Sequence, residues 1–215
     1  MNRISFQNYK GRLYCIVDRA VLGDRDPVQV AEAAIRGGAD WIQWRDKRTG
    51  DGEFLGVARQ LRDLTRRLKT VFVVNDRVAA ALLSQADGIH LGHEDLPVKE
   101  VRSLVGRGML IGRSTHSLAE AQEAQKDGAD YIGVGPVFQT PTKPDVPAVG
   151  LKLVAQVRQA IRIPWTAIGG IDLATLPLVL SAGARCVAVV RAVAGASDPE
   201  KAARSLKQLM RSTVR

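Results

Sequence analysis

The stretch GADYIGVGPVF, residues 128–138, joins a helix end to a short apolar strand and a glycine-rich turn. Its first glycine suits the left-handed backbone position that closes a helix, and the apolar run that follows is typical of a buried strand. Glycine, alanine and a charged residue recur before apolar runs at 38–40 and 183–185, with a variant at 86–88. The chain therefore contains several copies of one helix-to-strand unit.

Short apolar runs alternate with longer helical patterns along the whole chain. We expect strands at 13–17, 41–44, 71–74, 88–91, 110–112, 131–135, 165–168 and 186–190. Helix start signals stand between them, at Asp26-Pro27, Ser117 with Glu120, and Asp198-Pro199. Strands that alternate with helices favour a parallel sheet. Because no GxGxxG motif follows the first strand, a single-domain (βα)8 TIM barrel is favoured over an open dinucleotide-binding sheet.

The length and composition predict one α/β domain over residues 1–215, in which residues 1–12 form an extension before the first strand. The N-terminus does not resemble a secretory signal, and no apolar run approaches the ~18 residues of a spanning helix. We therefore expect a cytoplasmic protein without a membrane partner. Cys15 and Cys186 lie far apart in apolar runs, which predicts small core side chains rather than zinc ligands.

The net charge of +9 indicates an attraction for anions. Part of it, Arg59, Arg62, Arg66 and Lys69, recurs at helical spacing and predicts the solvated face of one helix. Aromatic residues make up only 5% of the chain, which leaves little material for stacking nucleic-acid bases. We expect small-molecule partners and no nucleic acid, and a non-catalytic phosphate or nucleic-acid binder remains an alternative.

Polar residues follow the second strand, and function in such barrels sits at the carboxyl ends of strands. The two-residue period places Gln43, Arg45 and Lys47 on one side, with Trp44 packing outward and Asp46 beside it. An amide, a guanidinium and an ammonium make a set of donors suited to phosphate. The alternative is a solvated strand end with salt bridges.

Asn75-Asp76 follows the third strand and Asp95 follows the fourth. Each group could simply cap the next helix. Together they place two carboxylates at neighbouring strand ends, which suits Mg²⁺ with water and phosphate oxygens completing its shell. Ser114 and His116 follow the fifth strand. We expect a hydrogen-bonding role for Ser114 and a structural role for His116.

The long loop after the sixth strand, residues 133–144, is rich in glycines, hydroxyls and prolines and carries Lys143. A ligand that orders it would explain this composition. Gly169-Gly170 after the seventh strand and Arg191 after the eighth offer backbone amides and a cation where barrels often bind phosphate.

These motifs, taken together, resemble the thiamine phosphate synthase family from about Leu13 to the last helix. They are Q-x-R-x-K, N-D, H-L-G with an acidic pair and proline, G-x-S-x-H, G-P-x-F-x-T-x-T-K, I-G-G-I and a terminal apolar strand. The resemblance implies a transferase that joins 4-amino-2-methyl-5-hydroxymethylpyrimidine diphosphate to a thiazole phosphate. The products would be thiamine phosphate and pyrophosphate, with Mg²⁺ as cofactor, and the chain could form a homo-oligomer.

The resemblance also implies roles for individual residues. Those assigned to the pyrimidine diphosphate are Gln43, Trp44, Arg45, Asp46, Lys47, Asn75, Ser114 and Lys143. Those assigned to the thiazole phosphate are Thr140, Pro141, Thr142, Gly170, Val190 and Arg191. Asp76 and Asp95 would hold the metal, and Arg45, Lys47 and Lys143 would be catalytic by stabilising charge on the departing pyrophosphate.

Two positions depart from the family pattern, because Arg191 stands where the family commonly has serine and His93 where it often has glutamine. A related barrel, the thiazole tautomerase, is a second alternative, in which His116 would carry a proton. That enzyme would need neither a diphosphate nor a metal, so the donors and carboxylates described above favour the synthase.

Overall fold

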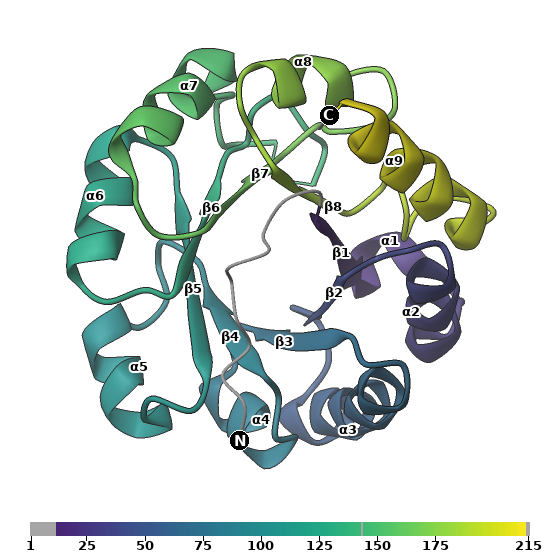
Figure 1. Cartoon of the computed structure of the whole chain (residues 1–215). Coiled ribbons are helices and arrows are strands. Elements are labelled where there is room, and N and C mark those ends of the chain that lie inside the picture. The colour runs from purple at the N-terminus through teal and green to yellow at the C-terminus, as the bar shows by residue number, and fades with distance from the viewer. Residues whose placement is uncertain (1–11, 143, 214–215) are drawn as a thin grey trace.

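The computed structural model describes residues 12–142 and 144–213, and its strands are joined side by side into a closed parallel barrel (Figure 1). The strands in this part of the chain are β1 (Arg12–Asp18), β2 (Trp41–Arg45), β3 (Val71–Asn75), β4 (Gly88–Leu91), β5 (Leu110–Thr115), β6 (Tyr131–Val134), β7 (Trp165–Ile168) and β8 (Cys186–Val189). Each strand pairs with the next, and β1 pairs with β8 to close the ring.

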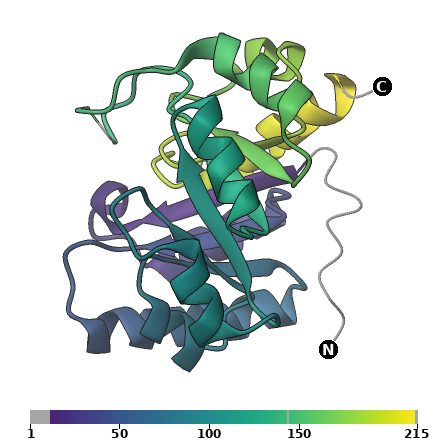
Figure 2. The same cartoon turned by 90° about the vertical axis from the view of Figure 1, so that its left-hand side faces the viewer.

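Helices surround the barrel on its outer side, as the views along and across its axis show (Figures 1 and 2). They are α1 (Arg19–Leu22), α2 (Pro27–Arg36), α3 (Asp51–Arg67), α4 (Val78–Leu83), α5 (Val98–Val105), α6 (Leu118–Lys126), α7 (Gly150–Ala160), α8 (Leu176–Ser181) and α9 (Pro199–Thr213). The predicted (βα)8 barrel is therefore confirmed.

All eight expected strands are present in the described residues, with ends shifted by a few positions. β1 begins at Arg12, so this residue is not part of an extension, and residues 1–11 lie outside the described part of the chain. β5 continues to Thr115 instead of ending at Gly112, because Ser114 and Thr115 pair with β6. Ser114 consequently belongs to the barrel wall and not to a loop.

The expected helix starts are confirmed. The Asp26 carboxylate accepts a hydrogen bond from Val28 N at 2.8 Å, and the Ser117 hydroxyl accepts one from Glu120 N at 3.2 Å. The Glu120 carboxylate accepts from the N–H of His116, one residue before the cap. The Asp198 carboxylate accepts from Lys201 N.

The basic stripe on α3 is only partly solvated. Arg59 and Arg66 are exposed on α3 as expected, and Lys69 is exposed but lies after the end of the helix. Arg62 differs, because its guanidinium reaches 2.6 Å from the carboxylate of Asp87 at the entrance to β4, and its side chain is only 11% exposed. This arginine ties α3 to the barrel.

Side chains on the two faces of the strands form separate apolar clusters. The outward face of β1, which includes Cys15, packs under the helices, whereas Tyr14 points into the barrel. There the ring of Trp41 lies 5.4 Å from the rings of both Tyr14 and Tyr131. Cys15 and Cys186 are both buried, which confirms their assignment as core side chains. The aromatic cluster fills the barrel interior near the amino ends of the strands.

None of the helices in residues 12–142 and 144–213 combines the length and apolarity needed to cross a membrane.

Helices α2 and α9 approach closely at Gly37, where a methyl group would lie 2.3 Å from the carbonyl oxygen of Glu200 and 2.7 Å from Cβ of Ala203. We therefore expect Gly37→Ala to lower the free energy of unfolding by about 1–3 kcal/mol, since backbone must move to admit the methyl. Gly56→Ala is the matched control, because it lies on α3 with open space around it. That change should stabilise the protein by about 0.5–1 kcal/mol. Urea titration measures both, and equal effects in the two variants would contradict the close approach.

Candidate active site

A cavity of about 660 Å³ lies at the carboxyl ends of the strands. The residues predicted for the pyrimidine diphosphate and metal that line it are Gln43, Arg45, Lys47, Asn75, Asp76, Asp95 and Ser114. Those predicted for the thiazole phosphate that line it are Thr140, Thr142, Gly170, Val190 and Arg191. Residues from distant parts of the chain thus meet in one cavity.

Some predicted residues are not brought into this cavity. Trp44 is fully buried on the opposite face of β2, where its ring lies 5.6 Å from that of Phe54. The Asp46 carboxylate turns back to accept hydrogen bonds from its own loop, including one from Arg48 N at 2.8 Å. The outward packing of Trp44 is the one expected from the alternation of side chains along a strand, and neither side chain is part of the cavity lining. Pro141 is exposed outside the cavity lining, and Lys143 lies outside the described residues.

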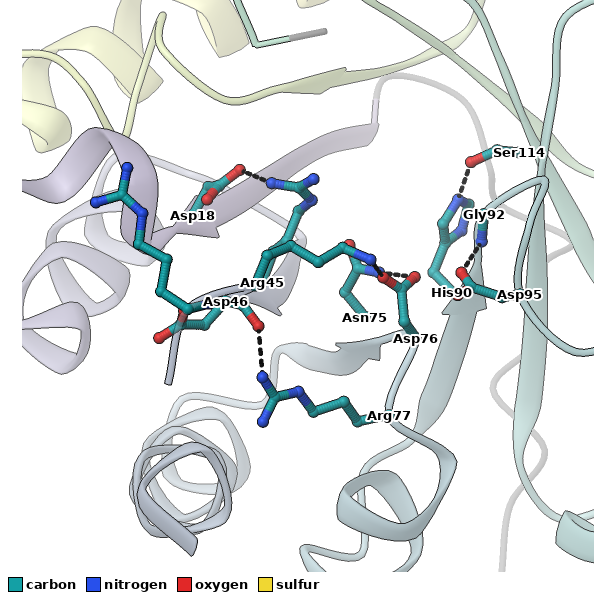
Figure 3. A network of polar contacts seen from close by, with 12 residues as sticks. Asp18, Arg45, Asp46, Asn75, Asp76, Arg77, His90, Gly92, Asp95 and Ser114 are labelled. Carbon is teal, nitrogen blue, oxygen red and sulfur yellow. Dashed lines mark hydrogen bonds and ion pairs between the residues drawn. The ribbon is translucent and has the colours of Figure 1, made fainter. Parts of the chain in front are cut away.

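A buried ion pair holds the guanidinium of Arg45 at the mouth of the barrel (Figure 3). Its partner is Asp18, the last residue of β1, whose side chain is only 1% exposed. The second oxygen of Asp18 accepts a hydrogen bond from Ala20 N at 3.0 Å, which fixes the carboxylate. Sequence reasoning missed Asp18, although its place at a strand end was a usable signal. The ion pair therefore fixes the position of the Arg45 guanidinium at the cavity, where it could bind an anion.

The carboxylate of Asp76 is the centre of a second polar group at the ends of β3 and β4. It pairs with the ammonium of Lys47 and accepts a hydrogen bond from the amide of Asn75. Asp95 faces it and accepts from Gly92 N at 2.6 Å. Neither carboxylate caps a helix, because α4 and α5 begin without a side-chain cap. Both are therefore directed at the cavity, and the capping alternative is wrong.

The two carboxylates interact unfavourably when both are ionised. Burial and the neighbouring Asp95 raise the pKa of Asp76 to about 6, although Lys47 opposes the rise. At Asp95 burial also acts to raise the pKa, but hydrogen bonds from Asp76 and Gly92 N outweigh it, and the pKa is lowered. The pair consequently favours one shared proton or a bound cation.

Two arginines hold the loops that carry these groups. The guanidinium of Arg77 donates to the carbonyl oxygens of Asp46 and Thr49, at 3.1 and 2.7 Å, and so braces the loop with Lys47. Arg113 donates to the carbonyl oxygens of His93 and Leu96, which flank Asp95. Neither arginine stood out in the sequence, because each contact joins segments that are distant along the chain.

The glycine pair after β7 is packed against the loop that follows β6, which extends past the end of the barrel (Figure 2). A methyl group at Gly169 would lie 2.4 Å from Cα of Pro136, and both Gly169 and Gly170 have positive φ. The N–H of Phe138 donates to the carbonyl oxygen of Gly169 at 3.0 Å. Only glycine fits here, so the tight turn and the start of the long loop form one unit.

Arg25 joins the segment after β8 to the end of α1. Its guanidinium donates to the carbonyl oxygens of Ala194 and Ala196 at 2.6 and 2.7 Å, and to that of Leu22. The segment that carries Val190 and Arg191 is thereby held at the cavity.

Uncharged polar groups make up the floor of the cavity. His90 lines it from β4 and contacts the hydroxyls of Ser114 and Tyr131. In the sequence, His90 is part of the H-L-G motif, and Tyr14 and Tyr131 lie inside expected strands without a role assigned to them. Their convergence depends on pairing between distant strands, which a pattern along one strand does not reveal.

His116 also lines the cavity. Its backbone N–H donates to the carboxylate of Glu120 at 2.8 Å, and its Nδ1 lies 3.3 Å from the same oxygen. This contact fits the structural role expected for the residue, because Glu120 holds both backbone and ring at the start of α6.

Comparison with known proteins gives one consistent family. The family model described as thiamine monophosphate synthase matches residues 13–193. A thiamine-phosphate synthase of Syntrophomonas wolfei is 44% identical over 198 residues, covering 92% of this chain and 95% of the relative. One from Synechococcus sp. (strain WH7803) is 52% identical over 85% of this chain, which spans only 52% of that relative's length.

The structural comparison agrees. Thiamine phosphate pyrophosphorylase from Pyrococcus furiosus superposes with a TM-score of 0.90 at 37% identity, covering 98% of this chain and 100% of that protein.

The raised pKa of Asp76 predicts a pH dependence in the presence of a chelator. A raised carboxyl pKa stabilises the fold fully below the unfolded value, and this contribution is lost as pH rises through the folded value. Asp76→Asn removes the ionisation, and asparagine tolerates the positive φ of this position. We expect the variant to melt about 2–4 °C above the parent near neutral pH, for about 1 kcal/mol after solvent screening.

The difference should vanish near about pH 4, where the parent carboxyl is protonated. The lost ion pair with Lys47 has little weight, because that side chain is 55% exposed. Asp63→Asn on the exposed face of α3 is the control, and its melting difference should not change with pH. Melting curves at both pH values decide the matter: an Asp76→Asn difference that is the same at each would refute the raised pKa.

Proposed function

This chain belongs to the thiamine monophosphate synthase family, and we propose that it is a transferase that makes thiamine phosphate. The proposed substrates are 4-amino-2-methyl-5-hydroxymethylpyrimidine diphosphate and a thiazole phosphate. The observation that carries the proposal is the cavity itself, in which two cations and two facing carboxylates lie beside an uncharged polar floor. This arrangement suits a ring with a diphosphate tail.

The charged side of the cavity fits the diphosphate. Arg45 is held by Asp18, and Lys47 reaches Asp76, so both cations lie on the same wall. A guanidinium and an ammonium complement phosphate oxygens, the first by a fork and the second as a point charge. We assign Lys143 to the same role from its place in the motif. These three residues would be catalytic, because they stabilise charge on the departing group.

Asp76 and Asp95 fit a divalent cation. The raised pKa of Asp76 reflects the proximity of two carboxylates in a partly buried place, and a cation would remove that repulsion. The described residues contain no group of three or more acidic, histidine or cysteine ligands, so the remaining ligands would be water and phosphate oxygens. That is the ligand set Mg²⁺ prefers. Bound Mg²⁺ would neutralise charge on the diphosphate.

The reaction breaks the bond between the pyrimidine methylene and the diphosphate oxygen, which leaves with the electron pair. The thiazole nitrogen then forms a bond to the same methylene with its lone pair. No side chain has to act as a nucleophile in this step. The electron-rich aminopyrimidine stabilises the positive charge on the methylene in between. Arg45 and Lys47 lower the barrier by holding the pyrophosphate, and Gln43 and Ser114 would orient the ring.

The opposite wall fits the thiazole phosphate. Gly170 follows β7, Arg191 follows β8, and Thr140 and Thr142 come from the long loop after β6. Carboxyl ends of the last two strands are a frequent phosphate site in these barrels. Because Arg25 anchors the segment around Arg191, the exposed guanidinium of Arg191 can reach an anion from a fixed backbone.

A thiazole tautomerase is the second candidate. It is favoured by one observation, the place of His116 in the cavity beside the carboxylate of Glu120. A histidine with a carboxylate at its ring can carry a proton. That reaction requires neither a diphosphate nor a metal, so it does not explain Arg45, Lys47 and the two carboxylates. The synthase is therefore preferred.

The direct test mixes the purified protein with both substrates and Mg²⁺ and follows thiamine phosphate by its fluorescent oxidation product. We expect product that a chelator abolishes. Asp95→Ala should lower turnover by at least about a hundredfold, since it removes preorganised charge at the leaving group. Asp63→Ala, on an exposed face of α3, is the matched control and should keep full activity.

Product formation that persists in chelator, or near-normal turnover of Asp95→Ala, would overturn the metal assignment. Absence of product from the folded parent would overturn the synthase, and isomerisation of the thiazole phosphate would then be measured.

The position of Arg191 predicts that its substitution changes the KM for the thiazole phosphate alone. Arg191→Ser should raise the KM for the thiazole phosphate about tenfold, because it removes a charge-assisted contact, while the KM for the pyrimidine diphosphate stays constant. Arg185→Ser is the control, since Arg185 is exposed before β8 and lies outside the cavity lining. Initial rates with each substrate varied in turn distinguish the two constants. An unchanged KM for the thiazole phosphate would show that Arg191 does not contact it.

A further inference from the structure

The segment that follows the first strand, residues 18–25, lies between the two proposed anion sites. In the closed ring β1 pairs with β2 on one side and with β8 on the other (Figure 1). The cations Arg45 and Lys47 stand at and just beyond the end of β2, and Val190 and Arg191 follow β8. Because neighbouring strands are parallel, the segment after β1 emerges at the mouth between these two groups. It contains the short helix α1.

The first residue of this segment holds the wall on the side of β2. The carboxylate of Asp18 is only 1% exposed, and both of its oxygens are engaged. Oδ1 accepts a hydrogen bond from Ala20 N at 3.0 Å, at the start of α1, and Oδ2 pairs with the guanidinium of Arg45. A carboxylate repels a phosphate, so Asp18 can favour a phosphate only through the position that it gives to Arg45.

The next residue, Arg19, ties α1 to the loop that carries Lys47. Its Nε lies 3.7 Å from the buried carboxylate of Asp46, and its Cζ lies 5.8 Å from the centre of the Trp44 ring. The same carboxylate accepts a hydrogen bond from Arg48 N at 2.8 Å, within the loop. The start of the segment thus supports both the strand end and the loop that provide the two cations.

The last residue of the segment, Arg25, holds the wall on the side of β8. Its guanidinium donates within the segment to the carbonyl oxygens of Val21 and Leu22, at 3.2 and 3.1 Å. The same guanidinium donates across to the carbonyl oxygens of Ala194 and Ala196, at 2.6 and 2.7 Å. One planar group therefore joins the end of α1 to the turn after β8.

The turn after β8 links this contact to the cavity over a few residues. Ala194 N donates to the carbonyl oxygen of Val190 at 2.8 Å, and both Val190 and Arg191 line the cavity. Gly195 packs against the backbone of Arg191, since a methyl group there would lie 2.8 Å from its carbonyl oxygen. The turn is compact, so a shift of Ala194 at its contact with Arg25 would move the backbone that lines the cavity.

We propose that residues 18–25 form a positioning segment shared by both substrates: Asp18 places the guanidinium that binds the pyrimidine diphosphate, and Arg25 places the turn that binds the thiazole phosphate. The inference rests on the proposed function. Asp18 and Arg25 are positioning residues, because each acts through a group that contacts a substrate. A binding group held in place before the ligand arrives loses less entropy on binding, so displacing one end of the segment weakens one substrate and not the other.

Two charge-conserving substitutions test the two ends of the segment. Asp18→Glu keeps the carboxylate and moves it by one methylene, so it displaces Arg45 without changing the net charge. Arg25→Lys keeps the charge but replaces the planar fork by one ammonium group, which cannot hold all four carbonyl oxygens. Equilibrium titration with each substrate in the presence of Mg²⁺ measures the dissociation constants without requiring turnover.

We expect Asp18→Glu to raise the Kd of the pyrimidine diphosphate at least about tenfold and to leave the Kd of the thiazole phosphate within about twofold. Arg25→Lys should show the reverse. Each variant is therefore the control for the other, since a general loss of order around α1 would weaken both substrates. Asp24→Glu is a further matched control, because Asp24 is exposed in the same segment, and it should keep both dissociation constants.

An equal weakening of both substrates in either variant, or an unchanged Kd for the substrate assigned to it, would overturn the inference. A parent that binds both substrates but forms no thiamine phosphate would refute the proposed transferase, and the two titrations would still decide the inference. A parent that binds neither substrate would overturn both.

A measurement on the parent protein covers the case in which a variant does not fold. Amide hydrogen exchange of the free protein should be slow at Ala194 and Ala196, whose N–H groups donate to the carbonyl oxygens of Val190 and Val193. The inference requires that Arg25 order this turn before a ligand arrives. Fast exchange at both amides in the free protein, with protection only after thiazole phosphate is added, would overturn it.

Discussion

All strands of the barrel run parallel and the ring is closed between β1 and β8, so every strand in the described residues delivers its carboxyl end to the same mouth. This constraint explains why short polar segments scattered along the chain form one cavity. Each βα unit contributes one or two side chains, and the alternation along its strand decides which of them face inward. Gln43 and Arg45 point inward for this reason, and Trp44 between them packs under α3.

The charges at the mouth are held in place before any ligand arrives. Arg45 is paired with a buried carboxylate, and Lys47 reaches the carboxylates at the ends of β3 and β4. Fixed charges lose little entropy when an anion binds, and they need no reorganisation when charge develops on a leaving group. The same arrangement carries a cost, since Asp76 and Asp95 repel each other when both are ionised. An acidic pair of this kind is unfavourable for folding and suitable for a cation.

Much of the fold could be predicted from local patterns, because strands, helix caps and closing glycines each leave a signal within a few residues. Residues that end a strand with charge, such as Lys47 and Asp76, could be placed at the mouth on the same basis. Asp18 and His90 were missed because their partners belong to other strands. The register between paired strands cannot be inferred from the sequence of any single segment. Side-chain contacts between strands therefore become visible only in the closed barrel.

The floor of the cavity unites the packing of the barrel with recognition. Tyr14 and Tyr131 contribute large rings to the cluster around Trp41, and their hydroxyls form hydrogen bonds with each other and contact Gln43 and His90. Apolar residues in the same places would fill the barrel equally well but would remove the hydroxyls that Gln43 and His90 contact. The burial of these hydroxyls costs little stability, because each has hydrogen-bond partners. The barrel interior thus combines close packing with hydrogen bonds that extend from Gln43 to Ser114.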